Sequence, residues 1–65
     1  MNKNKLFNDN EKKLTAALQR VSEARKQFSS TDSPLGQKAA LVTLQGELEA
    51  IDLLIDIQLI KYKEV

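Results

Sequence analysis

Ser29-Ser30-Thr31-Asp32-Ser33-Pro34 is the stretch that decides the fold, because turn-forming residues cluster nowhere else in the chain. Pro34 suits the first position of a helix, where its missing N–H would have no intrahelical partner in any case. Ser33, or alternatively Asp32, can cap that helix by accepting a hydrogen bond from a free backbone N–H. The cluster therefore predicts a single break between two helices, with a turn over residues 29–33.

The residues before the turn have the spacing of an amphipathic helix over about residues 9–28. Apolar side chains recur every three or four positions, at Leu14, Ala17, Leu18, Val21, Ala24 and Phe28. Asn8 and Glu11 have the spacing of a capping box, which predicts a helix start near Asn8, with an earlier start at Asn2 or Asn4 as the alternative. We therefore expect residues 1–8 to form a flexible N-terminal segment and residues 9–65 to form the helical unit.

The residues after the turn predict a second helix over about residues 34–62. Its apolar residues alternate three-residue and four-residue steps, with Gln58 in the one polar slot, and comprise Leu41, Leu44, Leu48, Ile51, Ile55 and Tyr62. This spacing is that of a heptad seam, and a short connection makes two helices antiparallel neighbours. The sequence therefore predicts an all-α antiparallel two-helix hairpin.

The second helix carries more apolar surface than one seam can use, because nine of the thirteen residues from Leu48 to Ile60 are aliphatic. The residues that this reasoning places outside the seam are Gly46, Ala50, Leu53, Leu54, Ile57 and Ile60. Large exposed apolar patches on small proteins usually mark interfaces. We therefore expect these six residues to bind a partner protein, and a homodimer is the alternative way to bury them.

The charges divide unevenly along the chain. Residues 1–28 carry a net charge of +4 and residues 29–65 a net charge of −3. Opposite charges on the two halves favour folding back of one helix on the other, although each exposed pair contributes only about 0–1 kcal/mol.

The composition argues against most chemical functions. The chain has neither Cys nor His, and Ser29, Ser30, Thr31 and Ser33 have no neighbouring base, so we expect no catalytic, cofactor-binding or metal site and no enzyme activity. Glu49, Asp52 and Asp56 share one helix face and are interpreted as a solvated strip. The net charge of +1 argues against nucleic-acid binding. No signal peptide is visible and the apolar run is too short to insert into a membrane, so we expect a cytoplasmic protein.

Two segments, residues 18–28 (LQRVSEARKQF) and residues 48–57 (LEAIDLLIDI), resemble the small E-type co-chaperones of bacterial type III secretion needle subunits. Those proteins are helical hairpins of similar length with a strongly aliphatic second helix. The resemblance implies that the chain pairs with a larger helical-repeat chaperone, and that the pair keeps a needle subunit monomeric in the cytosol. On this interpretation Leu53, Leu54, Ile57 and Ile60 would contact the partner chaperone.

Two other functions remain as alternatives. Small helical hairpins that dimerise into four-helix bundles and bind paired RNA loops are known in plasmid copy control, and the basic residues of the first helix would suit that role. Residues 45–49 (QGELE) are similar to the Ser-Gln-Glu-Leu-Asp signature of small hairpin phosphatases that act on sporulation response regulators. Here Gly46 replaces the glutamine and Glu49 replaces the aspartate, so the amide and acid of that signature are altered.

Overall fold

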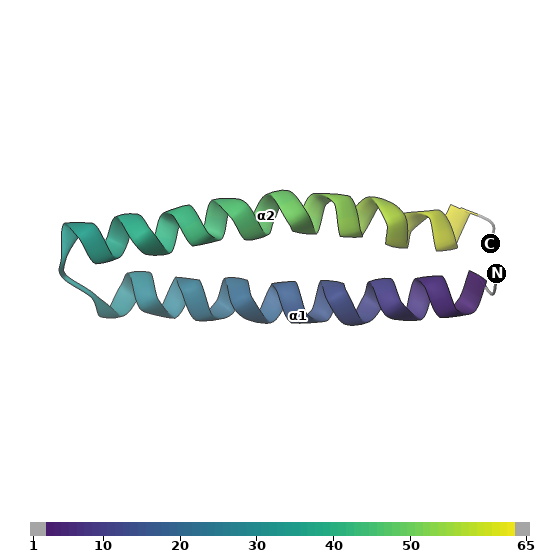
Figure 1. The fold of residues 1–65 in the computed structure, drawn as a ribbon, viewed down its shortest axis with the longest axis horizontal. Coiled ribbons are helices and arrows are strands. Elements are labelled where there is room, and N and C mark those ends of the chain that lie inside the picture. The colour runs from purple at the N-terminus through teal and green to yellow at the C-terminus, as the bar shows by residue number, and fades with distance from the viewer. Residues whose placement is uncertain (1–2, 64–65) are drawn as a thin grey trace.

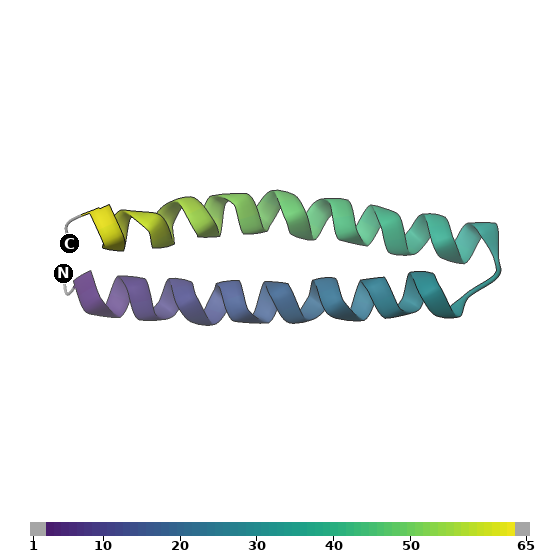
Figure 2. The same cartoon turned by 180° about the vertical axis from the view of Figure 1, so that it is seen from behind.

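The protein is a hairpin of two long antiparallel helices, seen in a computed structural model that describes residues 3–63. Helix α1 spans Lys3–Ser30 and helix α2 spans Pro34–Lys63. The helices lie side by side in one layer, so that the beginning of α1 is next to the end of α2 (Figures 1 and 2). The molecule measures 47 × 18 × 14 Å. The predicted all-α two-helix hairpin is confirmed.

The turn is built from short polar side chains and is three residues long. Ser33 is the cap of α2, since its Oγ accepts a hydrogen bond from the Gly36 N–H at 3.3 Å and its carbonyl accepts from the Gln37 N–H at 2.9 Å. The Thr31 Oγ1 accepts from the Ser33 N–H at 3.2 Å. A Cβ on Gly36 would lie 2.8 Å from that same Oγ1, so a larger residue at this position would displace the Thr31 side chain.

The first helix is longer than the capping-box spacing predicts. It begins at Lys3 rather than near Asn8, so residues 3–8 belong to the helix, while residues 1 and 2 of the expected flexible segment lie outside the described residues. Phe7 is half-buried and Asn10 is buried against the end of α2. This packing explains why the helix extends past a local capping signal, since tertiary contacts supply most of the stability of helices in proteins.

The inner face of α1 agrees with the predicted stripe except at Leu18 and Phe28, and Phe28 is 36% exposed beside the turn. Ala17 and Ala24 are buried, and Leu14 and Val21 are half-buried at the alternating spacing of a heptad seam. Leu18, however, lies beside the seam and is 53% exposed. Buried alanines at such positions allow the two backbones to approach closely, so the core is narrow.

The inner face of α2 differs from the predicted seam. Besides Gly36 at the turn, the residues that are buried or half-buried along its length are Gln37, Ala40, Leu44, Glu47, Ile51, Leu54 and Gln58. Only Leu44, Ile51 and Gln58 are shared with the predicted seam. The four other predicted positions, Leu41, Leu48, Ile55 and Tyr62, are exposed. Compared with the predicted orientation, α2 is therefore rotated about its own axis. Ala40, Glu47 and Leu54 face α1, and the next residue after each of them does not.

Polar groups of α1 account for this rotation. The Asn10 side chain donates hydrogen bonds from Nδ2 to the Leu54 carbonyl at 2.9 Å and to the Gln58 Oε1 at 2.8 Å. The Arg20 guanidinium pairs with Glu47. Without these hydrogen bonds the buried Asn10 side chain would have no partner, which is costly. The observed rotation satisfies Asn10 and still buries Ile51.

Candidate docking surface

The hairpin exposes more surface than a compact protein of its size. Its accessible area is 5337 Å². The area scaling of folded monomers gives about 4,200 Å² for a chain of 7.3 kDa. The excess arises because two helices in one layer can bury only one side of each. A surface of this kind is available to other macromolecules, and much of it on α2 is aliphatic.

One exposed apolar surface, called here the Leu53 flank, consists of Gly46, Ala50, Leu53, Ile57 and Ile60. All five residues are exposed on α2, and Leu53 is 68% exposed. They return to the same side of the helix at intervals of three, four and seven residues. Gly46 has open space around it, since a Cβ added there would meet no atom within 4 Å. The structure thus brings together five of the six residues that the sequence assigns to partner binding.

The sixth residue, Leu54, is placed differently. It is half-buried on the seam, and its carbonyl accepts the hydrogen bond from Asn10. The expectation that Leu54 lies outside the seam is therefore wrong. The error has the same cause as the misassigned seam, because the rotation of α2 brings Leu54 inward and Ile55 outward.

A second exposed apolar surface was missed by the sequence reasoning. It consists of Leu41, Leu48, Ile55 and Tyr62 of α2 together with Leu18 of α1, and is called here the Leu48 flank. Its members are all exposed, and Leu48 is 54% exposed. The α2 members are spaced seven residues apart, and this regular spacing was the sequence signal for a continuous row. Periodicity alone assigned the row to the seam. The Leu48 flank borders one side of the seam and the Leu53 flank extends from the other.

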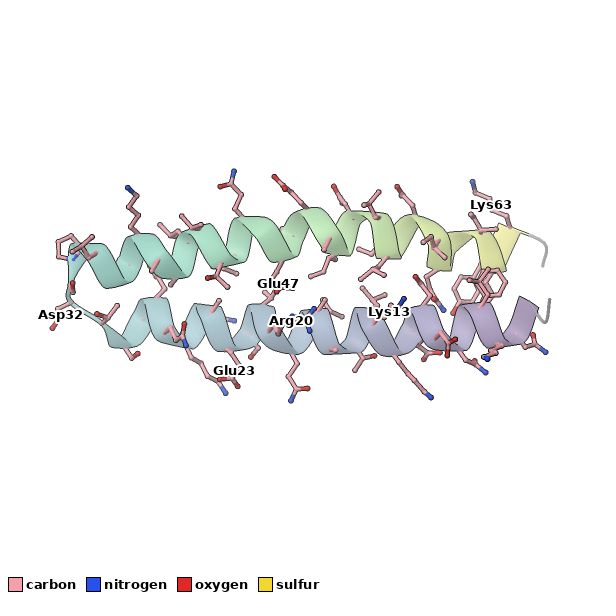
Figure 3. The ribbon with its side chains drawn as sticks, in the orientation of Figure 1. Lys13, Arg20, Glu23, Asp32, Glu47 and Lys63 are labelled. Atoms are coloured by element: carbon pink, nitrogen blue, oxygen red, sulfur yellow. The ribbon has the colours of Figure 1, made fainter. Side chains whose placement is uncertain are left out.

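Arg20 and Glu47 fix the alignment of the helices at mid-length. The Arg20 Nε donates a hydrogen bond to the Glu47 Oε1 at 2.9 Å, and the two side chains reach toward each other between the helices (Figure 3). The Glu47 side chain is 20% exposed and that of Arg20 is 56% exposed. An ion pair as exposed as this adds about 0–1 kcal/mol, so it aligns the helices more than it stabilises them. Glu47 belongs to residues 45–49, the segment that is similar to the phosphatase signature, and its carboxylate is already paired with Arg20.

The remaining polar groups are spread along the outside of the hairpin. Among residues 3–63, no three acidic side chains lie close enough together to hold a metal ion. One open hollow of about 560 Å³ lies along α1 and is lined by Ser22, Arg25, Lys26, Ser29 and Ser30. Neither helix, over the described residues, combines the length and the apolar character needed to cross a membrane. No family model, curated protein or solved structure matches this chain.

Proposed function

We propose that this chain is a non-catalytic binding protein that docks the Leu53 flank of α2 on a helical partner protein. The observation that carries the proposal is the exposure of Leu53, Ile57 and Ile60 along one side of a stable helix. Anchors at this spacing are typical of a helix that binds in an apolar groove. The small residues Gly46 and Ala50 continue the same flank and would let a partner helix approach closely.

The apolar side chains of this flank can supply part of the binding energy of a specific complex, and further contacts must supply the rest. Burial of a large aliphatic side chain contributes about 1.5–3 kcal/mol. Scaled by their exposed fractions, Leu53, Ile57 and Ile60 together offer about 2–5 kcal/mol before the costs of association. The hairpin presents these side chains on a preformed helix, so little ordering is required on binding. The flank can therefore act as the centre of an interface.

We propose further that the partner is a larger helical-repeat chaperone, and that the complex keeps a type III secretion needle subunit monomeric in the cytosol. The resemblance of residues 18–28 and 48–57 to E-type co-chaperones supports this role. Stacked helical repeats form extended concave surfaces, which suit an amphipathic helix of this length.

The test is affinity capture of the tagged chain from its native cytosol, with mass spectrometry of the bound proteins. We expect a helical-repeat protein in stoichiometric amount together with a small filament-forming subunit. Leu53→Asp and Ile57→Asp should lose both proteins while retaining the helical circular dichroism signal. Leu35→Asp is the matched control, because Leu35 is an exposed leucine of the same helix near the turn, distant from the flank.

Two results would contradict this proposal. Capture that is unchanged in Leu53→Asp and Ile57→Asp would exclude the Leu53 flank as the binding surface. Recovery of the chain alone, with no helical-repeat protein, would exclude the co-chaperone role. RNA-binding and phosphatase assays would then test the two alternatives.

A further inference from the structure

The Leu48 flank remains uncovered when the Leu53 flank docks on a partner. Its α2 members are spaced seven residues apart, so they follow one side of the two-helix coil for three heptads. Leu41, Leu48 and Tyr62 are each at least half exposed, and Ile55 is 39% exposed. A row of this length and regularity exceeds what scattered surface leucines would produce. It therefore requires an explanation of its own.

Leu18 of α1 belongs to the centre of this row. Arg20 lies opposite Glu47 on the other helix. Because the helices are antiparallel, Leu18, two residues before Arg20, faces the turn of α2 that contains Leu48 and Glu49. Leu18 comes directly after the seam residue Ala17, and Leu48 comes directly after the seam residue Glu47. Residues at these equivalent heptad positions lie on the same side of an antiparallel helix pair. The middle of the flank thus has one leucine from each helix.

The charges along this side of α1 are placed symmetrically about Leu18. Glu11 precedes Leu18 by seven residues and Arg25 follows it by seven, and both are exposed. Neither forms an ion pair with the residues that the structure describes. The neighbouring positions that border the flank on the outside of α1 are all uncharged and comprise Asn8, Thr15, Ser22 and Ser29. The opposite side of α1 carries Lys13 and Arg20 instead.

We propose that a second copy of this chain covers the Leu48 flank, related by a twofold axis that passes near Leu18 and Leu48 at right angles to the helices. About this axis Leu18 and Leu48 each meet their own counterparts. Leu41 meets Ile55 of the second copy, since both are seven residues from Leu48. Glu11 of each copy meets Arg25 of the other. The product is a four-helix bundle in which all neighbouring helices are antiparallel.

Symmetry favours a second copy over an unrelated protein as the occupant. In a twofold interface, a residue on one side of the axis contacts, in the second copy, the residue that lies equally far on the other side. The two residues must therefore be complementary. The equal spacing and opposite charge of Glu11 and Arg25 meet this requirement, as do the apolar pair Leu41 and Ile55. A partner of different sequence would not need that symmetry.

The exposed area of the hairpin as a whole leaves room for an interface of standard size. The hairpin exposes about 1,100 Å² more than a compact monomer of its mass. A specific interface of standard size buries about 800 Å² on each partner. Since the Leu53 flank lies outside this interface, the dimer would still bind two copies of a helical partner.

Sedimentation equilibrium of the purified chain tests the proposal. We expect a dimer for the unmodified chain and a monomer for Leu48→Asp, whereas Leu53→Asp should remain dimeric as the matched control. Circular dichroism must show that both variants are folded. A chain that is monomeric at about 100 μM, which would mean binding weaker than roughly 5–6 kcal/mol, would overturn the proposal. So would a dimer that Leu53→Asp dissociates and Leu48→Asp does not.

Charge reversal gives a second test that does not depend on apolar residues. Each dimer would contain two Glu11–Arg25 contacts, so Arg25→Glu or Glu11→Arg alone should raise the dimer dissociation constant by about tenfold. The double variant Glu11→Arg/Arg25→Glu should return it to within about twofold of the original value. Failure of the double variant to recover would overturn the proposed axis. These measurements use the chain alone, so their outcome is independent of whether a helical-repeat chaperone is captured.

Discussion

Replacement of Asn10 by alanine should destabilise the hairpin, although alanine is the better helix former. Asn10 is 5% exposed, and its Nδ2 group donates to the Leu54 carbonyl and to the Gln58 side chain. Each hydrogen bond between neutral groups contributes about 1 kcal/mol, so loss of both removes about 2 kcal/mol. The higher helix propensity of alanine returns about 0.6 kcal/mol. The expected net loss is about 1.4 kcal/mol.

Asn8→Ala is the matched control for this prediction. Asn8 is exposed on the same helix and gains the same propensity without losing a contact across the seam. The two variants should therefore differ by about 2 kcal/mol in the free energy of unfolding. Urea unfolding followed by circular dichroism at one fixed protein concentration measures this difference, since self-association would otherwise shift the apparent stability.

A double-mutant cycle with Gln58→Ala isolates one of the two hydrogen bonds. The coupling energy between Asn10 and Gln58 should be about 1 kcal/mol, because the bond to the Leu54 carbonyl is unaffected by removal of the Gln58 side chain. A coupling near zero, or equal stabilities for Asn10→Ala and Asn8→Ala, would refute the argument that Asn10 sets the rotation of α2.

Three further substitutions probe the close packing, the turn and the Leu53 flank. Ala17→Leu should reduce the free energy of unfolding by about 1–3 kcal/mol in urea titrations, because Ala17 is 0% exposed and a larger side chain would separate the helices, whereas exposed Ala16→Leu should change it little. Ser33→Ala should cost about 1 kcal/mol in thermal unfolding, through loss of the cap on the Gly36 N–H, and an unchanged melting temperature would contradict that role. Gly46→Ala should stabilise the free chain by about 1 kcal/mol, because alanine is the better helix former and the added methyl has room. The same variant should weaken capture of a helical partner, because the methyl would hold the partner helix away from α2. Undiminished capture would argue against close helix approach at Gly46.

The turn and the helix count follow from local chemistry, which explains why they were predictable. Ser33 and Pro34 act through their own backbone and the next few residues, and the structure confirms Ser33 as the cap. The capping-box pair Asn8 and Glu11 illustrates the limit of such local signals. Phe7 and Asn10 contribute to tertiary packing on the end of α2, and α1 continues through the apparent start signal to Lys3.

The candidate docking surface was predictable in part. The excess of aliphatic residues after Leu48 follows from composition alone, and Gly46, Ala50, Leu53, Ile57 and Ile60 are exposed as expected. The assignment of Leu54 failed because Leu54 and Ile55 are adjacent and both continue a three-four pattern. Periodicity cannot distinguish between them when a helix is apolar on several sides.

The sequence by itself determined that the chain forms two helices, where the turn lies, and that the second helix has more apolar surface than the first can cover. Only the tertiary structure decided which side of α2 faces inward. That choice depends on Asn10 meeting Leu54 and Gln58, and on Arg20 meeting Glu47, across 44, 48 and 27 residues of sequence. Apolar burial is nearly equal for neighbouring rotations of such a helix, whereas buried polar groups accept only the rotation that supplies their hydrogen bonds.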